Sequence, residues 1–146
     1  REHYTDFRHY AGDVQAVKSA VADGELFARE AVIGTFIIPN VHPDVFLAMS
    51  GSTGVEKLDA LGIVESFSVA ALIEGADAAA KAAEVKLIEV RLAMALGGKA
   101  FFTMTGAVGA VRSAVTAAEE VISREGMLVN TVVIPSPRPE LLRDIL

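Results

Sequence analysis

The chain has 146 residues, of which 52% are hydrophobic, and its formal net charge is −6. Its lysines and arginines do not cluster and no basic stretch is rich in aromatic residues, which excludes nucleic acid as a main partner. It has no cysteine, so it cannot form disulfides, zinc–thiolate sites or cysteine-bound iron–sulfur clusters.

The first ten residues, "REHYTDFRHY", are polar and do not have the pattern of a signal peptide. No uninterrupted apolar stretch approaches the roughly 18–20 residues of a membrane span. We therefore expect a soluble, cytoplasmic protein with no membrane partner. The mean hydropathy of +0.43 is high for a soluble monomer, so we also expect much of the surface to be buried against other subunits.

Two stretches near the start recur later in the chain. "GDVQAVKSAV" (12–21) matches "GAVGAVRSAV" (106–115) at an offset of 94, and "IIPNVHPDVF" (37–46) matches "VIPSPRPELL" (133–142) at an offset of 96. The offset changes at a point where a helix would turn into a strand, and such turns tolerate insertions. Two matches in the same order predict an internal repeat.

The first copy, residues 1–48, is predicted to be the C-terminal half of a domain. Arg1–Thr5 corresponds to a loop of the second copy and Asp6–Ala11 to the strand that follows it. About 35 residues, the leading strand, helix and strand, have no counterpart. Half a sheet leaves unpaired strand edges. We therefore expect a separate polypeptide, a disordered stretch or a trimmed part of the parent chain to account for them.

Residues 49–59, "MSGSTGVEKLD", are rich in Gly and Ser and predict a linker. A complete second domain is predicted over 60–146. It begins with a strand at Ala60–Glu65, and Ser66 or Ser68 is expected to cap the alanine-rich helix that follows. Alternation of apolar and other residues from Ile88 to Leu96 predicts the next strand.

The second half of this domain repeats the pattern. "AFFTMT" (100–105) predicts a strand, and a helix is expected from Gly106 to Gly126. "LVNTVVI" (128–134) predicts the last strand, which the following prolines would end. The fold class is α/β (α+β), a split β-α-β-β-α-β domain with its helices on an antiparallel sheet.

These elements together resemble the bacterial microcompartment shell domain, most strongly in "GADAAAKAA" (75–83) and "IPSPRP" (134–139). The tandem arrangement is similar to trimer-forming shell proteins of the propanediol-utilisation type. The resemblance implies that three two-domain subunits form a pseudohexameric tile. Such tiles pack edge to edge with one another and with other shell proteins around enzymes, and small metabolites pass through a central pore.

The resemblance also implies roles for single residues. Lys81 and Arg138 match the lysine and arginine that the family places at the tile edge, whereas the first copy has His42 in the arginine position. The implied pore loops are residues Ala95, Leu96, Gly97 and Gly98 in the second copy and Glu2, His3 and Tyr4 in the first. Some relatives hold an iron–sulfur cluster through a cysteine in the position of Glu2, so we expect neither a cluster nor any other cofactor here.

The sequence argues against nucleotide-binding, metal and catalytic sites. "LGGKAFF" lacks the spacer and Ser/Thr of a phosphate loop, and "GAVGAV" lacks the third glycine of a dinucleotide loop. His3 and His9 lie roughly 20 Å apart along a strand, too far to share a metal within one chain. Three His3 side chains around a trimer axis are the alternative, but we predict no metal site. No base stands beside a nucleophile, so we predict no enzyme. A small-molecule-sensing α/β trimer without lateral assembly remains the alternative function.

Overall fold

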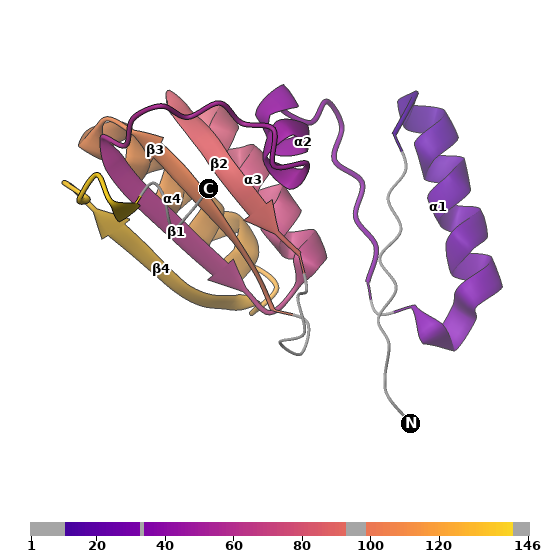
Figure 1. The fold of residues 1–146 in the computed structure, drawn as a ribbon. Helices are drawn as coiled ribbons and strands as arrows, with labels where there is room; N and C mark the ends of the chain where they lie inside the picture. Colours follow the sequence, from indigo (N-terminus) through magenta and orange to yellow (C-terminus); the bar gives the residue numbers. More distant parts are fainter. Residues whose placement is uncertain (1–10, 33, 93–98, 142–146) are drawn as a thin grey trace. The chain divides into compact units, whose positions relative to one another are not determined.

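The computed structural model describes residues 11–32, 34–92 and 99–141, and it divides into two compact units, Arg1–Asn40 and Val41–Leu146 (Figure 1). The first unit contains helix α1 (Val14–Ala28) and the short 3-10 helix η1 (Arg29–Ala31). The elements of the second unit are α2 (Pro43–Met49), β1 (Ala60–Ser66), α3 (Val69–Ala82), β2 (Val85–Arg91), β3 (Ala100–Gly106), α4 (Val108–Ser123) and β4 (Leu128–Ile134).

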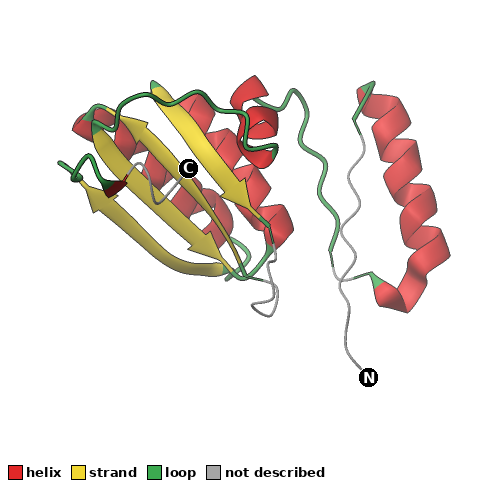
Figure 2. Ribbon diagram, in the orientation of Figure 1, coloured by secondary structure: helices red, strands yellow, loops and turns green. Residues whose placement is uncertain are grey.

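The second unit is a two-layer structure. Its four strands have the order β2-β3-β1-β4, and every neighbouring pair is antiparallel. Helices α3 and α4 lie together on one face of this sheet (Figure 2). From β1 onward the order is β-α-β-β-α-β, which confirms the predicted fold class. In the part of the chain that the structure describes, no helix is long and apolar enough to cross a bilayer.

Small residues allow the helices to approach the sheet and each other. A Cβ atom on Gly62 of β1 would lie 2.8 Å from Val111 Cγ1 of α4. A Cβ atom on Gly75 of α3 would lie 2.6 Å from Ile122 Cδ1. Both glycines therefore permit close packing around a core of large, fully buried side chains. These are Val64, Leu72, Leu87, Phe102, Met104, Val111 and Ile122.

Strand β2 is shorter than the alternation suggested and contains a bulge. It ends at Arg91, and residues 93–98 lie outside the described part of the chain. The pairing with β3 shifts between Leu87 and Glu89, so one extra residue is inserted there. Leu87 and Ile88 are both buried. Ile88 packs with Leu61 and Val55, on the face of the sheet opposite the helices.

The helix boundaries differ slightly from the prediction. Gly106 is the last residue of β3, and α4 begins two residues later. The helix ends at Ser123, and Gly126 lies in the following turn with φ +67°, a conformation that favours glycine. Ser68, one of the two predicted caps, accepts a hydrogen bond from the Ala71 N–H at the start of α3.

The segment that enters the second unit, residues 41–55, is named the strap here. Its helix α2 buries Val45 and Ala48. Beyond α2, in the predicted linker, Thr53 and Val55 are buried, and the Thr53 hydroxyl donates to the Ile88 carbonyl on the outer edge of β2. The linker is therefore not a freely solvated chain over its whole length. Helix α2, which the prediction assigned to the first copy, belongs to the second compact unit.

Helix α1 of the first unit has no buried residue. Asp13 caps it, because its carboxylate accepts hydrogen bonds from the N–H groups of Gln15 and Ala16. Near its other end, Leu26 and Phe27 are 76% and 93% exposed. The sequence of α1 therefore forms a capped helix whose apolar residues are not buried.

Candidate assembly edge and neighbouring pocket

Asp77 on α3 connects two of the three predicted edge residues. Its carboxylate accepts from Lys81 Nζ at 2.6 Å and from the backbone N–H of His42 at 2.7 Å. The spacing of four residues places Asp77 and Lys81 on the same face of α3. The second contact comes from a segment 35 residues earlier in the chain. Asp77 therefore ties the start of the strap to the predicted edge lysine.

The two partners of the ion pair, Asp77 and Lys81, differ in solvent exposure. The Asp77 side chain is 7% exposed, whereas that of Lys81 is 41% exposed. A buried carboxylate needs hydrogen-bond donors or a counter-charge, and here it receives both. An ammonium group has three donors, so Lys81 keeps two for other acceptors while one is directed to Asp77. The arrangement restrains the Lys81 ammonium group through one contact and leaves part of the side chain exposed.

His42 is the N-cap residue of helix α2. Its Nδ1 accepts from the Asp44 N–H at 3.2 Å, and Pro43 occupies the first helical position, where a missing N–H costs nothing. This contact requires an unprotonated Nδ1. The His42 side chain is thus occupied in capping α2, while its backbone is held by Asp77. The predicted edge histidine is a structural anchor in this unit.

A second carboxylate on α3, that of Glu74, has a raised pKa. Burial and the nearby Glu125 raise the pKa of Glu74 above its usual value, and Asp77 adds to this, while Arg124 acts in the opposite direction. Glu74 lies three residues before Asp77, toward the start of the helix. The two carboxylates of α3 therefore differ, because Asp77 has an ion-pair partner and Glu74 lies close to another acid.

Arg138, the third predicted edge residue, follows β4. Its side chain is exposed, and its backbone carbonyl accepts from the Leu141 N–H at 3.0 Å. No hydrogen bond or ion pair among the described residues joins it to Lys81. The second unit by itself therefore brings His42 and Lys81 together but not Arg138.

The predicted pore residues, Ala95–Gly98 and Glu2–Tyr4, lie outside the described residues. The ends of the second loop are described. Lys99, just before β3, lies 3.9 Å from a Glu65 oxygen and 5.3 Å from the centre of the Phe67 ring. Lys99 and Glu65 therefore place opposite charges at the point where this loop joins the sheet.

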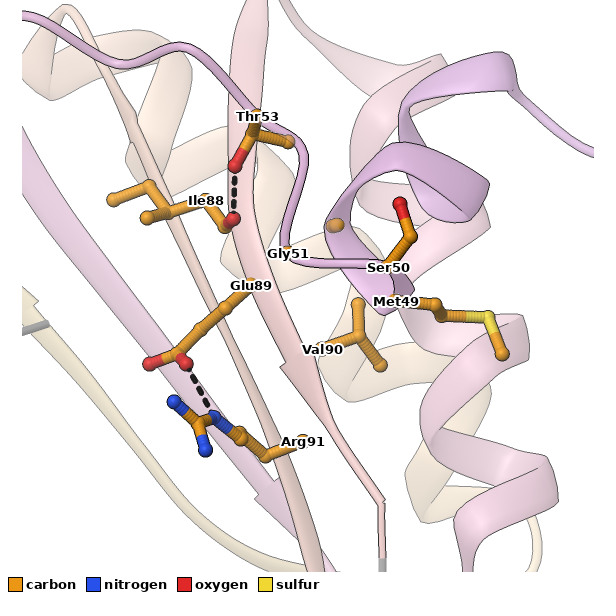
Figure 3. A pocket seen from close by; sticks show the side chains of 9 residues that line it. Met49, Ser50, Gly51, Thr53, Ile88, Glu89, Val90 and Arg91 are labelled. Atoms are coloured by element: carbon orange, nitrogen blue, oxygen red, sulfur yellow. Dashed lines mark hydrogen bonds and ion pairs between the residues drawn. The ribbon is translucent and has the colours of Figure 1, made fainter. Parts of the chain in front are cut away.

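A pocket of about 270 Å³ lies between the end of α2 and the edge strand β2 (Figure 3). On its β2 side, Arg91 Nε donates to Glu89 Oε2 at 2.7 Å, as Figure 3 shows. Sites for small ligands are typically about 300–1,000 Å³, so this pocket is small. Its lining residues are Ala48, Met49, Ser50, Gly51, Thr53, Ile88, Glu89, Val90 and Arg91.

The sequence did not single out Asp77 as a site residue, and it placed Thr53 in the predicted linker. The acid four residues before Lys81 was a usable signal for an ion pair. Nothing local indicated the bonds from His42 to Asp77 and from Thr53 to Ile88, because each spans 35 residues. Within residues 11–32, 34–92 and 99–141, no group of three acidic or histidine side chains is arranged to hold a metal ion.

The chain is similar to several known proteins. The BMC domain matches residues 60–137. Bacterial microcompartment shell protein PduT of Citrobacter freundii is 42% identical over 134 residues, covering 92% of this chain and 73% of PduT. Shell protein EutM of Salmonella typhimurium is 39% identical over 84 residues, 58% of this chain and 85% of EutM. A microcompartment protein of Desulfitobacterium hafniense has a TM-score of 0.84 and 50% identity, covering 90% of this chain and 73% of that one. PduT and EutM are structural shell proteins, which confirms the prediction that the chain is not an enzyme.

Proposed function

Since the chain belongs to the bacterial microcompartment (BMC) domain family, we propose that it is a structural shell protein whose subunits form pseudohexameric trimers that tile into sheets. The observation that carries the proposal is the 42% identity with a shell protein over 92% of the chain. The proposed partners are further copies of the chain and other shell proteins. A separate chain or segment is proposed to supply the leading β-α-β of the first domain.

Side-chain contacts support the assignment of two related domains. In the second unit the Thr131 hydroxyl donates to Glu119 of α4, and in the first unit the Thr35 hydroxyl donates to Glu25 of α1. The two threonines are 96 residues apart and the two glutamates 94 apart, which are the offsets of the repeat. Both threonine–glutamate pairs therefore lie at matching positions of the repeat, although residues 34–38 are not part of a sheet.

At the tile edge, Lys81 is proposed to contact a neighbouring tile. Asp77 restrains the Lys81 ammonium group and leaves part of the side chain exposed. Less side-chain entropy is therefore lost when Lys81 contacts a neighbouring tile. Arg138, between two prolines, would carry a planar donor group to the same kind of edge. His42 occupies the equivalent position of the first copy, so the two types of edge differ chemically.

The pore is proposed to lie on the three-fold axis and to be lined alternately by Ala95–Gly98 and by Glu2–Tyr4. The first of these loops is small and apolar, whereas the second carries a charge and an imidazole. Selectivity among metabolites would then depend chiefly on the first-copy loop. A crystal structure of the trimer with both loops far from the axis would contradict this assignment.

Assembly is the test of the shell function. Electron microscopy of the purified chain should show sheets, tubes or shells of roughly hexagonal tiles, and size exclusion with light scattering should give a trimer at low concentration. Lys81→Asp should keep the trimer and abolish extended sheets, and Arg138→Ala should weaken assembly less because it adds no repulsion. A persistent monomer at high concentration would contradict the shell function. Unchanged sheets for Lys81→Asp would contradict only the edge assignment.

The alternative is a small-molecule-sensing trimer, and the pocket beside Glu89 and Arg91 is the observation that favours it. Its size and its position on the edge of one unit make it the weaker explanation. Saturable binding of a metabolite by calorimetry, together with no lateral assembly under any condition, would favour this function over the shell.

A further inference from the structure

The outer face of α2 carries two apolar side chains that the packing of the second unit leaves uncovered. Phe46 is 49% exposed and Leu47 is 43% exposed, while Val45 and Ala48 of the same helix are buried. Phe46 follows His42 by four residues, so the two lie on the same side of the helix. The exposed residues therefore lie beside the anchor that joins α2 to Asp77 and Lys81.

Charges of both signs lie beside this anchor, because Asp44 contacts His42 and Lys81 contacts Asp77. Asp44, in the first turn of α2, is partly exposed, and Lys81 is 41% exposed. A two-fold symmetric contact brings the same patch of two molecules together, so a residue of one meets a different residue of the other. A patch that holds an acid, a base and apolar residues can therefore match a second copy of itself.

We propose that Phe46 and Leu47, flanked by Asp44 and Lys81, form the apolar centre of a two-fold contact between two molecules of this chain in neighbouring tiles. The proposal rests on the shell function and identifies the residues that hold this edge together. In it, the apolar pair supplies most of the affinity, because rim charges contribute mainly to orientation. Asp44 of one molecule faces Lys81 of the other.

The first experiment removes the apolar pair. The double variant Phe46→Ser/Leu47→Ser should keep the trimer mass and raise the protein concentration needed for sheets by about tenfold or more. The matched control is Leu26→Ser/Phe27→Ser, which removes a similarly exposed pair from α1. It should leave the concentration for sheets unchanged. Light scattering measures assembly, and size exclusion measures the trimer.

The second experiment uses the absence of cysteine from the chain. Phe46→Cys treated with a short bis-maleimide should give covalent chain dimers in assembled sheets and none at concentrations where only trimers exist. Leu26→Cys should give none in either state.

Three results would overturn the inference. They are unchanged assembly of the α2 double variant, equal loss of assembly in the α1 control, and cross-linking of Phe46→Cys within isolated trimers, which would place the pair inside the tile. If the parent chain forms no tiles at all, the shell function fails as well, so the two failures are distinguishable.

Discussion

Helices α1 and α4 match each other in sequence at an offset of 94 residues but have different surroundings. In α4 the apolar face is buried against α3 and the sheet, at residues Val111, Ala114, Val115, Ala118 and Ile122. The matching residues Val17, Ala20 and Val21 of α1 are only half-buried. Both helices form, and both make the same threonine–glutamate contact. Local sequence therefore suffices for the helix and its side-chain contact, whereas burial requires the elements that precede it in a complete domain.

The largest effect should come from a charge placed on the apolar face. Val115→Asp puts an unpaired carboxylate into the core of the second unit and should lower its free energy of unfolding by about 3 to 5 kcal/mol. The matched change Val21→Asp in α1 should have little effect on the unfolding of this unit. Urea denaturation followed by circular dichroism measures both. An equal loss for Val21→Asp would show that the face of α1 is covered in the assembled protein.

Two glycine-to-alanine changes should have opposite signs. A methyl group at Gly75 would meet Ile122, so Gly75→Ala should destabilise the second unit by about 1 to 3 kcal/mol. Gly24 of α1 has no atom within 4 Å of the added carbon, so Gly24→Ala should stabilise α1 by about 0.5 to 1 kcal/mol through helix propensity. Thermal unfolding tests the first and helicity of an isolated α1 peptide the second. A stabilising Gly75→Ala would contradict the close packing of α3 on α4.

The threonine–glutamate hydrogen bond, which is present in both units, should contribute a different amount of stability in each. Thr131→Val keeps the side-chain shape and removes the partly buried bond to Glu119, so it should cost about 0.5 to 1.5 kcal/mol. Thr35→Val removes an exposed bond to Glu25 and should cost much less. Denaturant titrations of both variants measure the difference. Equal costs would mean that residues 34–38 are as well packed as β4.

The smallest effect concerns pH and belongs to the second unit. Burial and Glu125 raise the pKa of Glu74, so the folded state favours its protonated form. The resulting stabilisation is complete below the usual glutamate pKa of about 4.3 and is lost as pH rises through the raised value. Glu74→Gln should therefore stabilise the fold at pH 7 by up to about 0.5 kcal/mol and have no effect at pH 4. A gain of the same size at both pH values would point to packing instead.

The sequence predicted the elements of the complete domain because their apolar periods are regular. Ala60–Glu65, 100–105 and 128–134 all coincide with strands to within a residue. It missed the bulge beside Ile88 because alternation assumes a period of two. It also missed that Thr53 is buried, because a Gly/Ser-rich segment carries no sign of the strand edge it covers.

For the edge residues, too, the sequence indicated local contacts but not tertiary ones. Lys81 and His42 came from resemblance, and no periodicity in the sequence pointed to them. Their connection through Asp77 depends on how α2 folds back on α3, which is a tertiary contact across 35 residues. Pairing of Lys81 with Asp77 was within reach of the sequence, since helix neighbours at this spacing interact. The role of Arg138 at an edge stays a prediction.

The strap also has a consequence for the order of folding during synthesis. Both of its anchoring bonds, from His42 to Asp77 and from Thr53 to Ile88, join a residue to one made 35 residues later. At a ribosomal rate of about 5–20 residues per second, each anchor waits roughly 2 to 7 s for its partner to be made. During that time Val45 and Ala48 have no surface to cover them. The strap is therefore fixed in place only after the later part of its own unit has been made.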